Sequence, residues 1–443
     1  MICKEEGRNQ NGTPSPRPEG PGQGADRTAR GNVIVLGGVQ NHIHLIEKLK
    51  ARGYHTLLAD YLDHPVAADY ADEHIQISTF DVDAIRELAK ERHAVAILNG
   101  CLEHLNKGIS LIGEELGLPV LYSYETALNV SNKQRMKRIM RDNGIPTTPF
   151  VSVRDTAELA DLPPLRYPLF VKPEDGSGST GVNRVEDPAR LKEFTEIAIG
   201  FSKNGAAIIE EEAVGKECNV YCVIRKGQAT LLTLSEKYSQ IGDGGKVTKA
   251  IGSLWPAQVS DKALENMRRA AQGIADAFRL DTTPMFMQLM VNGDEINIIE
   301  FACRMAGGYS YWNILHKLQF DYFDVTIDAC LGSDPKVELH DDGLRCAIHS
   351  LYASDCVFGR MEGLEALLEE GVISDFSVVR PAGTRITGIS ANKHKLGFFI
   401  VRDRTVDGVL DRVKRVYARI EAYDTEGRPV LLREPILDRS LLK

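Results

Sequence analysis

Hydrophobic residues are distributed unevenly along the chain, and the first strong pattern begins after residue 30. Residues 1–30 hold almost no large apolar side chains and are rich in Gly, Pro, Asn, Gln and charge. Such a segment cannot bury enough apolar surface to offset its ordering entropy, so we expect a disordered tail. The run Val33-Ile34-Val35-Leu36 is then continuously apolar and precedes two glycines, which predicts a buried parallel strand.

Strand-like and helical segments alternate from this run to about residue 125. Strands are predicted at 55–60, 94–98 and 120–122, and helices at about 43–51, 85–92 and 109–116. Because such alternation is typical of a parallel sheet covered by helices, residues 31–125 predict a doubly wound α/β lobe. Gly37-Gly38 could hold a nucleotide phosphate, but the GxGxxG spacing is absent, which favours a tight turn for packing.

The pattern changes after a basic helix that carries Lys133 and ends at Asn143-Gly144. Short strands and glycine-rich turns follow, and later segments are a helix at 262–278, strands at 286–291 and 296–302, a strand at 398–401 and an amphipathic helix at 406–420. We therefore expect three folded parts after the tail: the lobe at 31–125, a second α+β domain at 126–335 and a C-terminal mixed α+β domain at 336–443.

The composition is that of a folded protein with several domains. The chain has 443 residues, 53 basic and 62 acidic, which gives a formal net charge of −9. At roughly 150 residues per domain this length suggests about three domains, and the acidic balance argues against a general nucleic-acid-binding protein. No run of about 18 apolar residues could span a bilayer, and the N-terminus lacks a secretory signal. The eight cysteines have no metal-binding spacing, which favours a reducing, cytoplasmic setting. We therefore expect a cytoplasmic protein that contacts neither nucleic acid nor membrane.

The first chemical pattern is a lysine beside a glycine-rich loop. Lys172 lies at the end of a strand-like run, and residues 174–182 that follow contain Gly, Ser and Thr. A fixed cation next to several backbone N–H groups suits phosphate oxygens. The loop is not of the Walker type, because no Gly-Lys-Ser/Thr follows. A simple glycine-rich hairpin turn remains the alternative.

The second pattern is an apolar strand that leads into carboxylates. Ile208-Ile209 precede Glu210, and a turn glycine separates this run from Glu217. The edge of a strand offers N–H and C=O groups that can read an adenine edge, and a carboxylate suits ribose hydroxyls. A solvated acidic edge would have the same sequence.

The third pattern is a hairpin that carries oxygen ligands. Gln288 and Glu300 lie on two strand-like runs joined by Asn292-Gly293-Asp294, and their parity places them on one face. Two oxygen ligands on an apolar hairpin suit Mg²⁺ that bridges nucleotide phosphates. Arg304 follows and could hold a developing anion, although a buried ion pair of Glu300 with Arg304 is the structural alternative.

The order of these pieces resembles the ATP-grasp superfamily of ligases, which includes carbamoyl phosphate synthetase, biotin carboxylase and L-amino acid ligases. The resemblance covers roughly residues 32–440 and implies an ATP-grasp α+β fold at 126–335. It implies that Arg304 and Lys172 are catalytic, and that Gln288 and Glu300 hold metal. The ATP-binding residues that it implies are Lys133, Lys172, Glu174, Gly176, Ser177, Gly178, Ser179, Thr180, Gly181, Glu210, Glu211, Glu212, Ala213 and Glu217.

Two positions depart from the superfamily's pattern. Gln288 stands where an acidic residue is usual, although carbamoyl phosphate synthetase has glutamine there. Ala302 replaces the usual asparagine and has no side-chain oxygen. The number of metal ions, one or two, therefore stays open.

The resemblance implies an ATP-dependent carboxylate–amine ligase that forms an amide or dipeptide-like bond through an acyl phosphate and releases ADP and phosphate. ATP and Mg²⁺, with Mn²⁺ as an alternative ion, are the implied cofactors, and a homodimer is a further expectation. One rival is a bicarbonate-activating carboxylase, which the lack of an Arg-Arg-x-Gln-Lys-like run disfavours. The other is a catalytically silent nucleotide-binding protein, suggested by Ala302 and Gln288.

Two further segments are weaker candidates for substrate contacts. Lys246 and Lys249 lie in a glycine-rich segment that could recognise a carboxylate, or that could be a solvated loop. Tyr309, Tyr311 and Trp312 could line an acceptor site, although aromatic residues more often pack in a core. The lone His316 nearby is expected to be structural.

Overall fold

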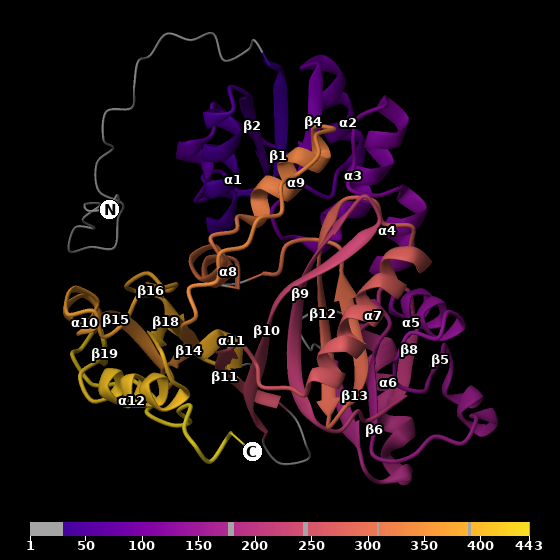
Figure 1. The fold of residues 1–443 in the computed structure, drawn as a ribbon. Helices are drawn as coiled ribbons and strands as arrows, with labels where there is room; N and C mark the ends of the chain where they lie inside the picture. The colour runs from indigo at the N-terminus through magenta and orange to yellow at the C-terminus, as the bar shows by residue number, and fades with distance from the viewer. Residues whose placement is uncertain (1–29, 176–180, 242–246, 308–309, 389–390, 443) are drawn as a thin grey trace.

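The fold begins with a four-stranded parallel sheet of order β3-β2-β1-β4 (Figure 1). The structure is a computed structural model that describes residues 30–175, 181–241, 247–307, 310–388 and 391–442. The strands are β1 (Asn32–Leu36), β2 (His55–Asp60), β3 (Glu73–Gln76) and β4 (Ala94–Leu98). The predicted strands at 55–60 and 94–98 are confirmed. The predicted disordered tail, apart from residue 30, lies outside the described residues.

Helices cover both faces of this parallel sheet. On one face lie α1 (Gln40–Ala51) and α9 (Tyr322–Cys330), and on the other α2 (Val82–Glu91) and α3 (Glu103–Leu116). The alternation of Val33 and Val35 with Ile34 and Leu36 explains both layers, because successive side chains of a strand point to opposite faces. Since α9 comes from far along the chain, the lobe is completed by a segment that lies outside 31–125 in the sequence.

The predicted strand at 120–122 is wrong. This segment connects α3 to α4 (Tyr124–Ser131), and it forms no strand in the structure. Val120 instead packs against α3, where a side chain on Gly113 would come within 2.2 Å of its Cγ1. Val120 is thus half-buried by close approach to a helix, without a strand partner.

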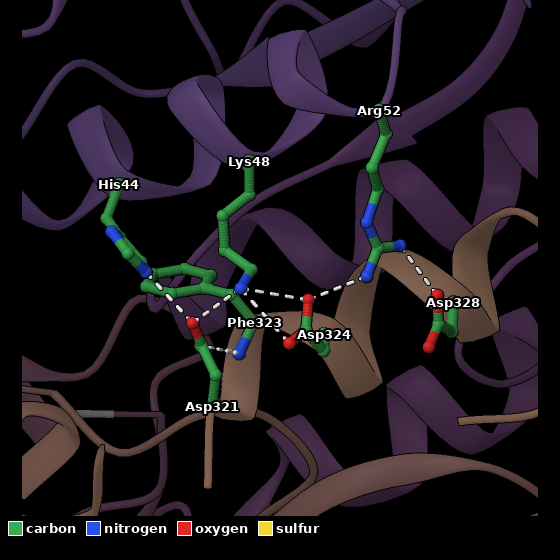
Figure 2. A network of polar contacts seen from close by, with 7 residues as sticks. All are labelled: His44, Lys48, Arg52, Asp321, Phe323, Asp324 and Asp328. Carbon is green, nitrogen blue, oxygen red and sulfur yellow. Dashed lines mark hydrogen bonds and ion pairs between the residues drawn. The ribbon is translucent and has the colours of Figure 1, made fainter. Parts of the chain in front are cut away.

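A contact network of alternating charge fixes α9 to α1 (Figure 2). The basic side chains are four residues apart on α1 and at its C-cap, and the carboxylates come from the N-cap and one side of α9. Lys48 Nζ lies 2.6 Å from Asp321 Oδ2, and Asp321 also accepts the N–H of Phe323 as the N-cap of α9. The network consists of His44, Lys48, Arg52, Asp321, Asp324 and Asp328.

A small antiparallel sheet of order β5-β8-β6-β7 forms the next layer, and α6 (Leu191–Phe201) packs on it. Its strands are β5 (Phe150–Val153), β8 (Ala207–Glu211), β6 (Leu169–Pro173) and β7 (Asn183–Val185). The helix α5 (Lys133–Asp142) leads into this layer. Short 3₁₀ helices lie at Ala68–Tyr70, Thr156–Asp161 and Pro188–Arg190.

The largest layer is an eight-stranded antiparallel sheet of order β13-β12-β9-β10-β11-β14-β18-β16. The helix α7 (Asp261–Ala277) covers one face, and α8 (Ser310–Leu318) with α9 covers part of the other. The strands are β9 (Lys216–Arg225), β10 (Gln228–Ile241), β11 (Val247–Trp255), β12 (Thr283–Asn292), β13 (Glu295–Ala302), β14 (Arg345–Tyr352), β16 (Asp375–Val378) and β18 (Lys395–Asp403).

The C-terminal part builds on the last strands of this sheet. The helix α12 (Val406–Tyr417) packs on β14 and β18, and a three-stranded sheet of order β17-β15-β19 lies beside it (Figure 1). The remaining elements are α10 (Leu364–Glu369), α11 (Ala391–His394), β15 (Cys356–Glu362), β17 (Arg385–Ile386) and β19 (Glu421–Asp424). None of the helices in the described ranges combines the length and apolar character that a bilayer crossing requires.

Candidate functional site

The small and large antiparallel sheets meet at a short tether. Ile298 of β13 donates its N–H to Pro146 O at 3.0 Å, and Thr147 Oγ1 donates to Ile298 O at 3.0 Å. The tether brings the first turns of α5 and the ends of β6 and β8 toward the hairpin of β12 and β13. The candidate site lies between these two sheets.

A buried carboxylate with two lysines forms one wall of the site. Glu210 Oε1 lies 2.5 Å from Lys172 Nζ, and Glu210 Oε2 lies 2.9 Å from Lys137 Nζ. Burial would raise the pKa of Glu210, but the charges of Lys172 and Lys137 outweigh it and hold the pKa at about 2. The carboxylate is therefore ionised, and it fixes the positions of both ammonium groups.

Local structure explains how these three side chains meet. Lys172 on β6 and Glu210 on β8 are diagonal neighbours, because Phe170 pairs with Glu210 and Lys172 pairs with Ile208. Lys137 follows Lys133 by one turn of α5, so both lysines share one face of the helix.

Lys133 connects this wall to the hairpin of the large sheet. Its Nζ lies 3.8 Å from Glu300 Oε2, across the gap between the two sheets. Burial lowers the pKa of Lys133, Glu300 opposes that shift, and the nearby charge of Lys172 adds to it. The ammonium groups of Lys133 and Lys172 are thus close enough to repel each other, and a polyanion would neutralise both.

Gln288 and Glu300 are direct neighbours across β12 and β13, as the hairpin pattern predicted. The amide nitrogen of Gln288 donates to Glu217 Oε1, which leaves the amide oxygen as the atom available to a cation. Glu217 also accepts from Lys237 at 2.7 Å. The side chain of Glu300 is 39% exposed, so its carboxylate is open to the gap.

This donor set fits Mg²⁺ held by few protein ligands. Mg²⁺ usually keeps several waters and binds through one or two protein oxygens together with substrate phosphates. Among the residues that the structure describes, no group of three or more His, Cys, Asp and Glu side chains could hold a metal by itself. The oxygens of Gln288 and Glu300 would therefore need phosphate oxygens and water to complete the coordination.

Arg304 lies beyond the end of β13 and points to the parallel-sheet lobe. Its Nε lies 2.6 Å from Glu103 Oε2, its Nη1 donates to Met305 O at 2.8 Å, and its guanidinium covers the ring of Phe286 at 5.2 Å. Arg304 thus pairs with Glu103, and Glu300 pairs with Lys133. Glu300 and Arg304 therefore do not form the ion pair that was the alternative interpretation of the sequence.

The carboxylate of Glu174 is buried and bonded within the protein, whereas the resemblance implied a contact with ATP. Its side chain is 1% exposed and accepts hydrogen bonds from Asn132 at 2.5 Å, Ser152 at 2.8 Å and Asn204 at 3.0 Å. Its carboxylate is therefore committed to anchoring the start of the glycine-rich loop. The loop residues Gly176, Ser177, Gly178, Ser179 and Thr180 lie outside the described residues, and Gly181 ends the loop with a φ of +73°.

Two of the three residues after Glu210 are held by contacts around the small sheet. Glu211 accepts from Arg166 Nε at 2.9 Å, and Glu212 accepts from Arg184 Nε at 2.8 Å. The N–H groups of Glu211 and Glu212 donate to the carbonyls of Pro149 and Pro168. A role in reading adenine would therefore fall to the carbonyl oxygens of this segment and to Ala213.

Some of the weaker candidates for substrate contacts lie outside the described residues, and others pack against aromatic rings. Lys246 and Tyr309 lie outside the described residues, and Lys249 Nζ lies 5.9 Å from the centre of the Tyr352 ring. Tyr311 is buried in the core beneath the parallel sheet, with Trp312 against it. His316 stacks on Trp312, so both side chains make packing contacts in the structure.

Sequence reasoning missed three residues of the site. Lys137 could have been found from its four-residue spacing to Lys133 on the helix. Glu103 lies just after the carboxyl end of β4, where ligands meet in open parallel sheets, so its place in the fold is a usable signal. Lys237 has no signal in the sequence, because its partner Glu217 is on another strand.

Comparison with known proteins connects this geometry to one domain type. Residues 131–307 match the ATP-grasp (A) domain of phosphoribosylglycinamide synthetase. The L-arginine-specific L-amino acid ligase of Bacillus subtilis is 23% identical over 227 residues, which are 49% of this chain and 53% of that protein. The chain spans about half the length of the curated relatives that it first matches.

Solved structures of low identity share the fold over most of the chain. An L-amino acid ligase from Bacillus licheniformis has a TM-score of 0.74 at 18% identity. The match covers 89% of this chain and 99% of the ligase chain. The biotin carboxylase domain of the Hydrogenobacter thermophilus 2-oxoglutarate carboxylase, a dimer with MgADP, ADP and bicarbonate, has a TM-score of 0.70 at 16% identity, with 90% and 91% coverage.

Proposed function

The chain carries an ATP-grasp domain, and on that premise we propose that it is an ATP-dependent carboxylate–amine ligase. The observation that carries the proposal is the contact between Lys133 and Glu300, because it joins a lysine-lined wall to a hairpin of oxygen ligands. Phosphates and a divalent cation are the groups that such a junction can bind together.

Lys133 and Lys172 would bind the phosphates of ATP, and Gln288 with Glu300 would hold Mg²⁺. When bound, the ion supplies positive charge to the transferring phosphoryl group. Lys172 is kept in place by Glu210, so its ammonium group needs no reorganisation when a phosphate oxygen approaches. Mn²⁺ accepts the same oxygen ligands and is proposed as an alternative ion.

The proposed reaction has two steps. A carboxylate oxygen of the first substrate attacks the γ-phosphorus of ATP, ADP leaves, and an acyl phosphate forms. An amine then attacks the acyl carbon and loses a proton, and phosphate leaves with its bonding electrons to give an amide. The guanidinium of Arg304, which is held by its ion pair with Glu103, would stabilise the negative charge of the acyl oxygen.

The proposed substrates are small molecules, one with a carboxylate and one with an amine, and a dipeptide-like product is the first to test. The similarity to an L-amino acid ligase supports this choice. A homodimer is proposed because the biotin carboxylase domain of the same fold forms one. A cytoplasmic location fits the seven described cysteines, all of which are free.

The test is release of ADP and phosphate by the full chain with ATP and Mg²⁺. Pools of amino acids are added first, then pools of small carboxylic acids combined with amines, and bicarbonate alone is a separate arm. Turnover that depends on both a carboxylate and an amine supports the ligase. Turnover with bicarbonate alone would replace the proposal with a carboxylase. Binding of ATP without turnover in any arm would replace it with a silent nucleotide-binding protein.

A further inference from the structure

A cavity of about 450 Å³ lies away from the nucleotide site, where the large sheet meets the C-terminal part. Lys216, Glu236 and Leu254 contribute from β9, β10 and β11. Arg345, at the start of the neighbouring strand β14, continues this side of the cavity. The beginning of α12 and the last described residues of the chain complete the lining.

The cavity and the nucleotide site lie on opposite faces of the same sheet. Lys216 and Glu217 are consecutive on β9, so their side chains point to opposite faces. Glu217 contacts Gln288 on the face with the metal ligands. Cys218, two residues after Lys216, packs with α7 on the other face. A ligand in the cavity would therefore not touch the residues proposed to hold ATP.

Cations outnumber carboxylates around the cavity. Glu236 lies 3.4 Å from Lys216, and Arg439 pairs with Asp407. Arg345 donates a hydrogen bond to the carbonyl of Pro256 at 3.3 Å. The cationic lining residues are Lys216, Arg345, Arg404 and Arg439.

The start of α12 adds partial positive charge to the same wall. Thr405 caps this helix of 12 residues, and both Thr405 and Val406 line the cavity. The N-terminus of a helix attracts anions through its N–H groups and its dipole. Leu254 and Leu442 add apolar surface, which suits the carbon part of a metabolite.

We infer that this cavity binds a small multivalent anion of the phosphate-ester class, separately from the nucleotide site. Guanidinium groups hold phosphate oxygens through paired hydrogen bonds, and three arginines surround one volume of about 450 Å³. That volume lies within the range of pockets that hold metabolites.

The test is isothermal titration of the full chain with pyrophosphate, which is the probe for the phosphate chemistry. Because pyrophosphate can also bind the proposed nucleotide site, the titration is repeated on Lys172→Met, in which that site is impaired. We expect one binding event to persist in Lys172→Met and to weaken at least about tenfold in Arg404→Glu, since a hydrogen bond to a charged group is lost. Arg404 is exposed, so the variant should keep its fold, which circular dichroism checks.

A matched variant separates a local effect from a change in overall charge. Arg385→Glu makes the same charge change at an exposed residue of β17 that does not line the cavity, and it should bind pyrophosphate as the wild type does. Equal loss in Arg385→Glu and Arg404→Glu would overturn the inference, because general attraction would explain the binding. Absence of binding in Lys172→Met, or unchanged binding in Arg404→Glu, would overturn it as well.

Discussion

Arg304 and Glu103 form an ion pair between the large sheet and the parallel-sheet lobe, with Nε and Oε2 2.6 Å apart. Burial raises the pKa of Glu103, and the charge of Arg304 opposes this shift without cancelling it. Glu103 is the first residue of α3, directly after the loop that follows β4. The position of the arginine proposed to stabilise the acyl oxygen therefore depends on the lobe.

Replacement of Glu103 by Gln should lower kcat by about 10- to 100-fold, because a small displacement of a positioned group has an effect of that size. The KM for ATP should change little, since Glu103 does not contact the proposed phosphate site. Steady-state ADP release measures both constants. Glu115→Gln, on the same helix but paired with Arg86 at the surface, should behave as the wild type. A matching loss in both variants would refute the positioning role.

Replacement of Glu300 by Gln should remove at least about 99% of the ADP release, because a metal ion supplies several kcal/mol of charge stabilisation. The fold should survive, since the carboxylate is 39% exposed and its nearest cation is 3.8 Å away. Thermal unfolding without ligand is the control measurement. Activity near that of the wild type would show that Glu300 is not a metal ligand.

Replacement of Gln288 by Glu should lower the half-saturating Mg²⁺ concentration by about three- to tenfold, because affinity for hard cations rises with ligand charge. The new carboxylate would face Glu217 and Glu300, so the metal-free protein should melt at a lower temperature. Melting curves with and without Mg²⁺ measure both effects. Gln288→Met, which removes the oxygen, is the matched variant and should require more Mg²⁺. An identical Mg²⁺ dependence in all three proteins would contradict the assignment.

Replacement of Glu210 by Gln should lower the free energy of unfolding by about 3–5 kcal/mol, because two buried lysines lose their shared counter-charge. The acid stability should also change. Burial would raise the pKa of Glu210, but the lysines hold it at about 2 in the folded state, against roughly 4.3 in an unfolded chain.

The sign of the pH effect follows from these two pKa values. Between about pH 4.3 and pH 2 the unfolded chain binds a proton at Glu210 and the folded protein does not, so stability falls as the pH falls. Urea unfolding at several pH values should show that the free energy of unfolding depends less steeply on pH in Glu210→Gln than in the wild type. Glu193→Gln, at an exposed surface pair, should match the wild type, and an unchanged slope in Glu210→Gln would contradict the ionised carboxylate.

Replacement of Asp321 by Ala should lower the free energy of unfolding by about 1–3 kcal/mol, because α9 loses its cap and Lys48 loses a partner. Asp321→Asn keeps the capping oxygen and removes only the charge, so it should cost less. Chemical denaturation compares the two. Equal losses would mean that the charge network of Figure 2, and not the cap, carries the whole effect.

Local sequence pattern predicts the strands at 55–60 and 94–98 and the order of the motifs, but it fails at 120–122, which forms no strand. The pairing of Gln288 with Glu300 was predicted from parity, but it holds for a reason that the sequence does not show. The register from Asn292 and Glu295 would place Ile299 opposite Gln288, and a bulge between Gln288 and Leu289 shifts it by one residue.

The remaining features depend on contacts between distant segments. The sequence does not indicate that α9 covers the parallel sheet, because that position depends on packing with α1. The buried position of Glu174 depends on Asn132 and Asn204, which belong to two different connections. Such contacts are decided by the tertiary fold, which a pattern along one chain does not contain.

The pairing of β11 with β14 joins the last hundred residues to the sheet that carries the proposed metal ligands. A fragment that ends at residue 335 would lose β14, β18 and β16, and β11 would become an edge with unpaired backbone groups. Such a fragment should self-associate rather than behave as a minimal enzyme. The C-terminal region therefore cannot be exchanged on its own. A chimaera with a relative would have to take β11 and β14 from the same protein.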